Sequence, residues 1–280
     1  MIAFVGSVFS PTYFRARRRH IAADPTAHCG FNVVVHGERV SSWAFSEYRG
    51  TEVERSADRL VLGRNQIDRS EHGLRVIVDE RTSPWGRPLR GQIRLESPMW
   101  MPDQFALDDA GRHVWWPVAP QATIHVDLEQ PKLRFVGTGY HDSNRGIEPL
   151  EQAFSRWTWS RSTDAGGTSL LYDVTASDGV DRRLGLRYGG GAVEPIEPSA
   201  MTGLGRSRWG LSRHTRVAPG GHARLQRTLV DTPFYARSII ETDLAGAPAI
   251  GIHEVVDLER FARTTTQLML PFRTRGAQWW

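Results

Sequence analysis

Apolar and polar side chains alternate with a period of two residues along much of this chain. In the segment 122–129, Ile124, Val126 and Leu128 fall on one face and polar side chains fall on the other. This alternation is typical of a β-strand with one buried face. Similar patterns predict further strands at Arg75–Asp79, Leu133–Val136, Thr168–Thr175, Arg183–Tyr188, Ala223–Val230, Ala236–Glu241, Ala249–Val255 and Thr266–Pro271.

Segments with helical periodicity are scarce and short. The two best candidates are Leu150–Phe154 and Asp257–Ala262. Turn sequences such as Ser177–Gly179 separate the predicted strands. Many short strands joined by turns favour an all-β fold, an antiparallel sandwich or barrel, over alternating strands and helices.

The chain is long enough for two β units. Its 280 residues exceed the usual size of a single domain. The run Pro117–Gly139 has predicted β structure on both sides and is a plausible junction. We therefore expect an N-terminal β domain at residues 1–137 and a C-terminal β domain at residues 138–280.

Charge is dispersed along the chain, apart from one dense basic run. Lys and Arg number 35 and Asp and Glu number 31, a net charge of +4. This dispersal, without a known binding motif, argues against a nucleic-acid partner. The dense run, Arg15–Arg19, follows an apolar opening that is too short to span a bilayer, so neither a signal peptide nor a transmembrane helix is predicted. The run fits either contact with anionic lipid headgroups or a solvated loop. Cys29 is the sole cysteine, which excludes an intramolecular disulfide and suits a reducing compartment.

The densest group of chemically active side chains lies in a Gly-rich segment. It contains Tyr140, Asp142 and Asn144, and Trp157 and Trp159 follow at alternate positions. A carboxyl group, hydrogen-bonding partners and aromatic faces that tolerate a cation suit acid chemistry on an apolar molecule. Plainer interpretations exist for the same residues. Asp142 and Asn144 are common in turns, and the two tryptophans are equally consistent with a packed core.

Other enzyme classes lack their required motifs. The ten histidines have no spacing that places two on one strand or helix face, so no metal site is predicted. The segment Gly203–Arg208 lacks the flanking strand and helix of a dinucleotide-binding motif, and neither a phosphate-binding loop nor a nucleophile elbow occurs. Three further acids, Glu47, Asp79 and Glu80, could also face a cavity.

Six segments in order along nearly the whole chain match a known family. They are Phe4–Pro11, His28–Val33, Trp43–Glu47, Tyr140–Gly146, Trp157–Arg161 and Leu268–Arg273. Together they resemble the carotenoid 1,2-hydratases, or hydroxyneurosporene synthases, of photosynthetic bacteria. The resemblance implies two lipocalin-like antiparallel β-barrel or sandwich units packed together. It also implies a cofactor-independent hydro-lyase that adds water across the terminal 1,2 double bond of acyclic carotenoids such as neurosporene and lycopene.

The resemblance further implies which residues carry the reaction. The family's proton-donating Asp corresponds to Asp142, and its implicated Tyr, His and Trp correspond to Tyr140, His113 and Trp115. A proton delivered to carbon 2 leaves a tertiary cation at carbon 1, which water captures. A carboxyl group in a water-poor aromatic site can have its pKa raised by up to ~3–5 units, which keeps it protonated.

The other implicated residues would support this step. His113 would orient the acid or relay a proton, and Tyr140 would hold the attacking water. Trp115 would stabilise the cation through its ring face, by ~2 kcal/mol when desolvated. The residues expected to contact the substrate are Trp157, Trp159 and Asn144.

Two alternative functions are a non-catalytic lipocalin-like carrier of a hydrophobic ligand and a pericyclase of the same fold. The carrier would leave its ligand unchanged, and the pericyclase would need no proton donor. Because a carotenoid is too hydrophobic to be free in the cytosol, we expect a cytoplasmic protein in peripheral contact with the photosynthetic inner membrane. Exposed aromatic side chains and Arg15–Arg19 are the expected contact. The sequence does not predict which group activates the water.

Overall fold

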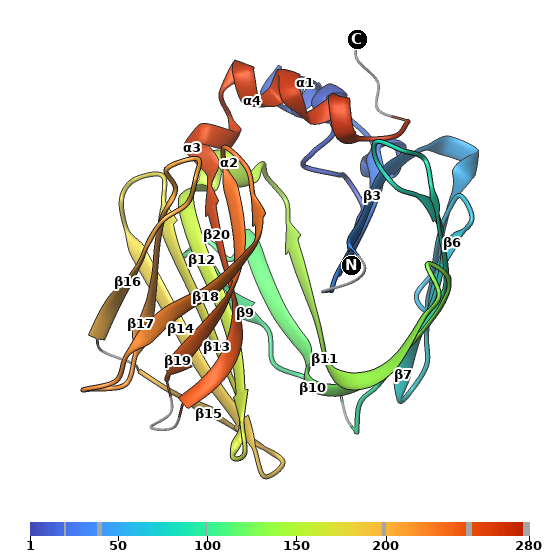
Figure 1. Ribbon diagram of the computed structural model, residues 1–280. Helices are drawn as coiled ribbons and strands as arrows, with labels where there is room; N and C mark the ends of the chain where they lie inside the picture. Colours follow the sequence, from blue (N-terminus) through green and yellow to red (C-terminus); the bar gives the residue numbers. More distant parts are fainter. Residues whose placement is uncertain (20, 38–40, 99, 198–199, 245–247, 277–280) are drawn as a thin grey trace. The chain divides into compact units, whose positions relative to one another are not determined.

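The structure consists mainly of antiparallel β-sheets, which confirms the predicted all-β class (Figure 1). It is a computed structural model that describes residues 1–19, 21–37, 41–98, 100–197, 200–244 and 248–276. The chain forms two compact units. The first unit comprises Met1–Trp100, Ala122–Tyr140 and Gln267–Trp280, and the second comprises Met101–Gln121 and His141–Thr266.

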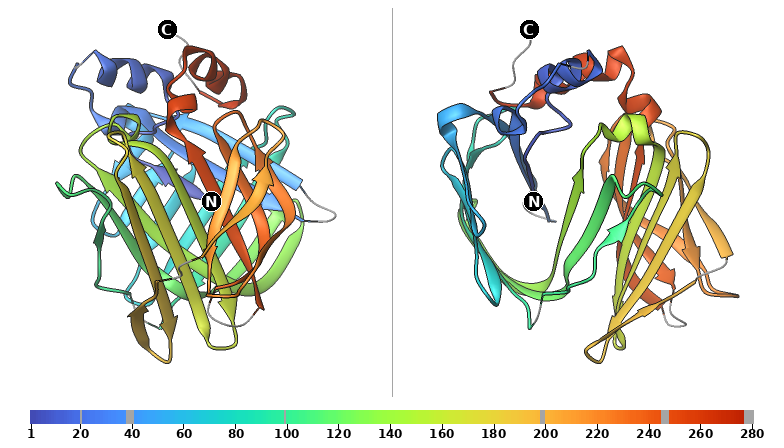
Figure 2. Two further views of the ribbon diagram at one scale, coloured as in Figure 1. Left: turned by 90° about the vertical axis from the view of Figure 1, so that its left-hand side faces the viewer. Right: turned by 180° about the vertical axis from the view of Figure 1, so that it is seen from behind.

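The first unit is built from a three-stranded sheet and a larger sheet whose last two strands continue into the second unit (Figure 2). The three-stranded sheet pairs β1 (Ile2–Phe4), β2 (Cys29–His36) and β3 (Ser41–Tyr48) in that order. The larger sheet has the order β11-β10-β8-β7-β6-β5-β4, and β9 pairs with β10. Its strands are β4 (Val53–Arg55), β5 (Arg59–Leu62), β6 (Asn65–Arg69), β7 (Gly73–Arg81), β8 (Pro88–Glu96), β9 (Phe105–Ala106), β10 (His113–Gln130) and β11 (Leu133–Gly146).

Alternate positions of β7 show how this unit builds its core. Val76 and Val78 are at most 3% exposed and belong to the main apolar cluster. Glu80 continues the same inward-facing row and is also 3% exposed. The period-two pattern of the sequence is therefore the pattern of burial, because successive side chains of a strand point to opposite faces. Glu80 therefore places a carboxyl group at a position where the period-two pattern predicts an apolar residue.

The second unit contains a seven-stranded antiparallel sheet and a two-stranded ribbon. The sheet order is β15-β14-β13-β12-β20-β19-β18, and the ribbon pairs β16 with β17. The strands are β12 (Phe154–Asp164), β13 (Gly167–Ala176), β14 (Asp181–Gly189), β15 (Ala192–Pro195), β16 (Ala200–Arg206), β17 (Ser212–Val217), β18 (Ala223–Asp231), β19 (Tyr235–Asp243) and β20 (Pro248–Asp257). The predicted strands between 168 and 255 lie within these elements.

One face of the seven-stranded sheet is buried and carries polar as well as apolar residues. Ser160, Ser238 and His253 are at most 5% exposed on this face. Arg213 of β17 donates to the Ser238 hydroxyl at 3.3 Å, and the His253 Nε2 lies 2.9 Å from the carbonyl oxygen of His214. Small serine side chains leave room for the longer side chains of the ribbon. The opposite face of the sheet carries the aromatic residues of the candidate site.

Short helices complete the fold. The helices predicted near Leu150 and Asp257 are confirmed as α2 (Leu150–Ala153) and α3 (Leu258–Phe261). The strand predicted at Thr266–Pro271 is wrong, since α4 (Thr264–Met269) and a 3₁₀ turn, η3 (Leu270–Arg273), occupy this segment. Its apolar residues are consecutive and do not alternate, so a period of two never applied.

A further helix, α1 (Pro11–Arg18), was not predicted and places most of the basic run on a helix. Its proline lies in the first turn, where a missing N–H costs nothing. The guanidinium of Arg17 lies over the Tyr13 ring at 4.6 Å, and that of Arg18 lies over the Phe14 ring at 5.6 Å. The basic run is therefore not a solvated loop.

The two compact units are discontinuous in sequence. The boundary predicted near residue 137 lies within β11, three residues before this strand passes from the first unit to the second at Tyr140. A division into domains at 1–137 and 138–280 stays a prediction. Among the described residues, no helix is both long enough and apolar enough to cross a membrane.

Candidate active site

The carboxyl group of Asp142 is held against a buried indole ring. Trp115 lies on β10 with no exposed surface, and its Nε1 donates to Asp142 Oδ2 at 3.0 Å. Asp142 itself is half-buried. It lies within β11, which extends to Gly146, so the interpretation of this segment as a turn is wrong. The extended strand aims Asp142 and Trp115 at each other across a pair of neighbouring strands.

Aromatic rings surround this hydrogen bond. The Trp115 ring lies 5.9 Å from the Phe105 ring and 5.1 Å from the Tyr172 ring, measured between centroids. The Trp157 ring lies 6.3 Å from that of Tyr172. All of these residues belong to the second unit. The indole that donates to Asp142 is therefore packed among aromatic rings.

Tyr172 is a site residue that the sequence analysis missed. It is 4% exposed, and its hydroxyl donates to Asn144 Oδ1 at 3.3 Å. Burial, followed by the charges of Asp142 and Glu254, raises the pKa of Tyr172 far above its ordinary value. Its position within the predicted strand Thr168–Thr175 offered one signal. There Tyr172 alternates with Leu170 and Val174, so one polar-tipped ring stands in an apolar row.

Asp142 and Asn144 are thus tied to the aromatic cluster by separate hydrogen bonds. Trp115 holds the first and Tyr172 holds the second. The two tied residues occupy alternate positions of β11, hence the same side of the strand. Asn144 was expected to contact the substrate, and this role stays a proposal.

The ring of His113 is anchored by two acceptors. Its Nδ1 lies 3.1 Å from Asp108 Oδ2, and its Nε2 lies 3.2 Å from the carbonyl oxygen of Glu148. His113 is 2% exposed, and a Cβ added at Gly146 would lie 2.5 Å from its ring. Its contacts therefore fix the start of β10 against the end of β11. This arrangement supports a positioning role for His113 two residues before Trp115.

Asp108 was not predicted to have a role, yet it anchors His113. Burial alone would raise the pKa of Asp108. Asp108 accepts hydrogen bonds from the backbone N–H groups of Arg112 and His113, at 3.0 and 2.7 Å. Together with the His113 ring, these donors outweigh the effect of burial on the pKa. The pKa of Asp108 consequently lies below its ordinary value. Asp108 is thus an acceptor for His113 rather than a proton donor.

Trp157 and Trp159 lie on one face of β12, as predicted. Both are half-buried rather than sealed in the core. Trp159 is the direct cross-strand neighbour of Tyr172 on β13 and of Glu254 on β20. These tryptophans therefore belong to the sheet face that carries the aromatic cluster.

Tyr140 lies on β11 at the end of the first unit. It is half-buried and precedes Asp142 by two residues along the strand. Its role in holding water stays a proposal.

A second carboxylate on the face of Tyr172 was also missed. Glu254 of β20 accepts two hydrogen bonds from Arg237 of β19, from Nε at 2.9 Å and from Nη2 at 2.7 Å. Burial alone would lower the pKa of Arg237. Its interactions with Glu254 and Tyr235 outweigh burial and raise this pKa above its ordinary value. No motif in the sequence marks this ion pair. Only the strand register brings the two residues side by side.

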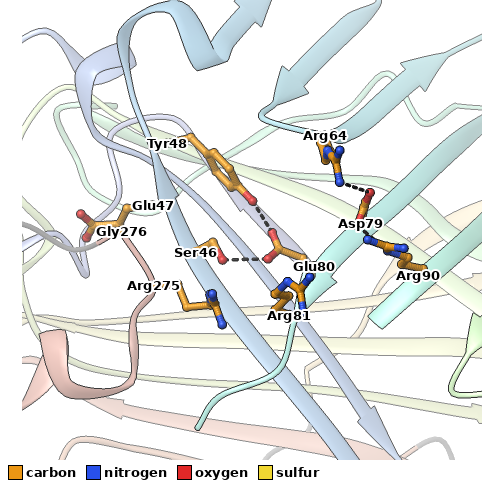
Figure 3. Close-up of a pocket in the computed structure, with 10 residues that line it drawn as sticks. All are labelled: Ser46, Glu47, Tyr48, Arg64, Asp79, Glu80, Arg81, Arg90, Arg275 and Gly276. Atoms are coloured by element: carbon orange, nitrogen blue, oxygen red, sulfur yellow. Dashed lines mark hydrogen bonds and ion pairs between the residues drawn. The ribbon is translucent and has the colours of Figure 1, made fainter. Parts of the chain in front are cut away.

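The three other acids that could face a cavity do so in the first unit (Figure 3). Glu47, Asp79 and Glu80 line a cavity of about 260 Å³. Asp79 is ion-paired with Arg90 at 2.8 Å and with Arg64 at 3.4 Å. Glu80 is the most buried of these three residues, at 3% exposed.

Glu80 is saturated with hydrogen-bond donors. Its Oε1 accepts from the Tyr48 hydroxyl at 2.7 Å and from Asn65 Nδ2 at 2.8 Å, and its Oε2 accepts from the Ser46 hydroxyl at 2.7 Å. Figure 3 shows the Ser46 and Tyr48 side chains pointing to this carboxylate. Three donors on two oxygens hold this side chain in one place. Glu80 is therefore a structural residue of the cavity wall.

Among the described residues, no group of three His, Cys, Asp or Glu side chains is arranged to hold a metal ion. The chemistry that the second unit offers is that of a carboxyl group, an indole N–H, a phenol and aromatic ring faces.

Comparisons with known proteins identify the family. Residues 1–280 match the model of the carotenoid hydratase CrtC family. An acyclic carotenoid 1,2-hydratase of Thiocapsa roseopersicina is 45% identical over 275 residues, covering 98% of this chain and 68% of the relative. That of Cereibacter sphaeroides is 36% identical over 283 residues, covering 100% and 99%.

The fold also resembles a solved structure. The crystal structure of a candidate AttH protein from Nitrosomonas europaea has a TM-score of 0.53 at 12% identity, covering 82% of this chain and 86% of that chain. This likeness supports the lipocalin-like β architecture and says nothing of activity. Because the family model matches the whole length, the chain belongs to the CrtC family of carotenoid hydratases.

Proposed function

We propose that this protein is an acyclic carotenoid 1,2-hydratase in which Asp142 protonates the terminal double bond. The observation that carries the proposal is the hydrogen bond from Trp115 Nε1 to Asp142 Oδ2 inside a cluster of aromatic rings. A water-poor surrounding disfavours the charged form of a carboxyl group. An indole N–H contributes no charge that would compensate.

The indole contact suits a protonated acid. An Oδ2 that accepts from Trp115 takes the part of the carbonyl oxygen, and the acidic hydrogen then resides on Oδ1. Asp142 transfers this proton to carbon 2 of the substrate while the π electrons form the new C–H bond. Carbon 1 becomes a tertiary cation, and water supplies the oxygen that captures it.

Aromatic faces beside the acid can stabilise the cation. The rings of Trp115, Tyr172 and Trp157 succeed one another at centroid distances of 5.1 and 6.3 Å. A desolvated cation over such a face gains about 2 kcal/mol. Tyr140 is proposed to hold water, and His113 to keep β10 in place. Trp159 and Asn144 are proposed to contact the polyene.

The direct test is an assay of purified protein with neurosporene or lycopene in detergent or lipid, without added cofactor. We expect a 1-hydroxylated product. In heavy water, the product should carry deuterium at carbon 2. Binding without a product would favour the carrier, and a product without solvent deuterium would favour the pericyclase. Either result would reject acid-catalysed hydration.

We also propose peripheral contact between the first unit and a membrane on its cytoplasmic side. Leu268, Met269 and Phe272 are 47%, 47% and 73% exposed, and Figures 1 and 2 show their segment beside α1. Arg18 and Arg19 are exposed on and after α1. Apolar side chains next to arginines match the acyl and anionic headgroup layers of a bilayer surface.

Sedimentation with vesicles tests the membrane contact. Binding should be stronger with anionic than with zwitterionic lipid, and a double variant Arg18→Gln, Arg19→Gln should remove this preference. Phe272→Ser should weaken binding to both kinds of vesicle. Val136→Ser, which alters an exposed apolar residue of β11 (65% exposed), serves as the control. Equal sedimentation of all variants would reject the proposed surface.

A further inference from the structure

We infer that Glu254 holds the attacking water and accepts its proton when the cation is captured. This inference rests on the proposed hydration and assigns a group to its second half. It starts from a row of side chains that crosses the seven-stranded sheet. Trp115, which is hydrogen-bonded to the acid Asp142, contacts one end of this row. Glu254 lies toward the other end.

The strand register fixes the row. Tyr172 of β13 is opposite Trp159 of β12, Trp159 is opposite Glu254 of β20, and Glu254 is opposite Arg237 of β19. Directly opposed residues have Cβ atoms about 5 Å apart on the same face. The Tyr172 ring reaches the Trp115 ring at 5.1 Å, and Trp115 holds Asp142 at 3.0 Å. The two carboxyl groups therefore belong to one continuous polar and aromatic surface within the second unit.

The electrostatics of Tyr172 agree with this placement. After burial, the ionised forms of Asp142 and Glu254 are the two causes that raise the pKa of its hydroxyl. One phenol thus senses both carboxyl groups. Tyr172 therefore lies close to both the proposed acid and the proposed base.

The surroundings of the two carboxyl groups differ in the way that acid and base require. Asp142 accepts from a neutral indole. Glu254 accepts from a guanidinium, with both contacts on Oε1. A neighbouring cation favours a carboxylate, whereas an apolar site favours the protonated acid. Two carboxyl groups with opposed surroundings are a recurrent basis for assigning acid and base.

Asp142 loses its proton to carbon 2, and an oxygen lone pair of water forms the C–O bond to carbon 1. Glu254 takes one proton from that oxygen, which leaves the neutral tertiary alcohol. One proton has then passed from Asp142 to Glu254. Both side chains keep some contact with solvent, so exchange with bulk water returns the enzyme to its starting state.

Heavy water separates this role from a structural one. Without the water-holding base, the cation forms but returns more often to the alkene, so recovered substrate gains deuterium at carbon 2. We expect Glu254→Gln to lower hydration by about 10²-fold and to raise the ratio of exchange to hydration by a similar factor. A merely structural role would lower both rates together and leave the ratio unchanged.

Two further variants keep the test decisive. Glu241→Gln removes another arginine-paired carboxylate of the same sheet, on β19 and bonded to Arg224 at 2.6 Å, and should behave as wild type. If Glu254→Gln leaves Arg237 unpaired and unfolds the protein, the double variant Glu254→Gln, Arg237→Met removes both charges. The ratio should rise in any folded variant that lacks Glu254.

The outcomes distinguish this inference from the proposed function. If the wild-type protein gives neither hydrated product nor exchange, hydration itself is wrong. If the wild type hydrates and a folded variant without Glu254 keeps the wild-type ratio, only the assignment of Glu254 is overturned.

Discussion

Each compact unit contains an acid that is hydrogen-bonded to side chains of neighbouring strands, and the two acids are held in different ways. Glu80 of the first unit receives three hydrogen bonds, spread over both carboxylate oxygens. Asp142 of the second unit accepts a hydrogen bond on Oδ2 from the indole of Trp115, whose ring packs on that of Tyr172. We propose that this kind of donor, rather than burial alone, separates the reactive carboxyl group from the structural carboxylate.

This difference has an energetic origin. Burial without donors makes the charged form of a carboxyl group expensive, whereas several well-placed donors compensate for the lost water. Glu80 is compensated, so it contributes rigidity to the wall of its cavity. For Asp142 we propose that the neighbouring aromatic rings favour a neutral group able to give up its proton.

The largest effect is expected from Asp142→Asn. Because asparagine preserves shape but has no acidic proton, turnover should fall by about 10³-fold. Circular dichroism and the thermal midpoint should stay close to those of the wild-type protein. Hydration within tenfold of the wild-type rate would show that Asp142 is not the acid.

Glu80→Gln should act on stability instead. The NH₂ of the glutamine is itself a donor and would face donors that point at the carboxylate in the wild type. The free energy of unfolding should therefore fall by about 3 kcal/mol. The measurement is urea unfolding followed by tryptophan fluorescence. Turnover per folded molecule should remain within twofold, and a loss comparable to that of Asp142→Asn would erase the distinction between the two acids.

Trp115→Phe tests the hydrogen bond from Trp115 to Asp142. The variant keeps an aromatic ring but loses the N–H group, so turnover should fall by about tenfold. Trp116→Phe is the matched control, since its indole donates to the carbonyl oxygen of Met101 and not to the acid. Equal losses in the two variants would mean that the contact with Asp142 has no special part.

The smallest effect is expected for Glu47, a second acid of the first unit that can be compared with Glu80. Burial raises its pKa to about 7, against the charge of Arg49 and a hydrogen bond from Ser10. The folded protein therefore binds this proton more tightly than the unfolded chain. The free energy of unfolding should decrease as pH rises from about 4.5 to about 7 and level off above that.

The change should amount to about 1 kcal/mol, because partial exposure weakens the effect. Urea unfolding at pH 5 and pH 8 measures it, and Glu47→Gln should abolish the contribution. An identical pH dependence in the wild type and the variant would show that Glu47 titrates normally.

Several strand positions were predictable because one face is buried, whereas strands such as β2 and β3 were not predicted. The alternation at 122–129 and at Thr168–Thr175 predicted parts of β10 and β13, because burial with a period of two leaves a direct trace in the sequence. The segment from Thr266 to Pro271 has consecutive apolar residues that do not alternate. The strand predicted there was wrong for that reason.

The candidate site was only partly predictable. The resemblance to a family supplied Asp142 and Trp115, and the structure joins them at 3.0 Å. Tyr172 and Glu254 reach the same surface through strand register and ring packing across the sheet. Such pairings depend on which strands become neighbours, and local spacing carries no record of them.

The protonation state of Asp142 is the most direct test of the whole account. A difference infrared spectrum at pH 7 between the wild-type protein and Asp142→Asn isolates this one carboxyl group. We predict that the wild type shows the carbonyl band of a protonated acid and that the variant lacks it. If the spectra differ only in carboxylate bands, Asp142 is ionised at rest and cannot begin the reaction as the proton donor.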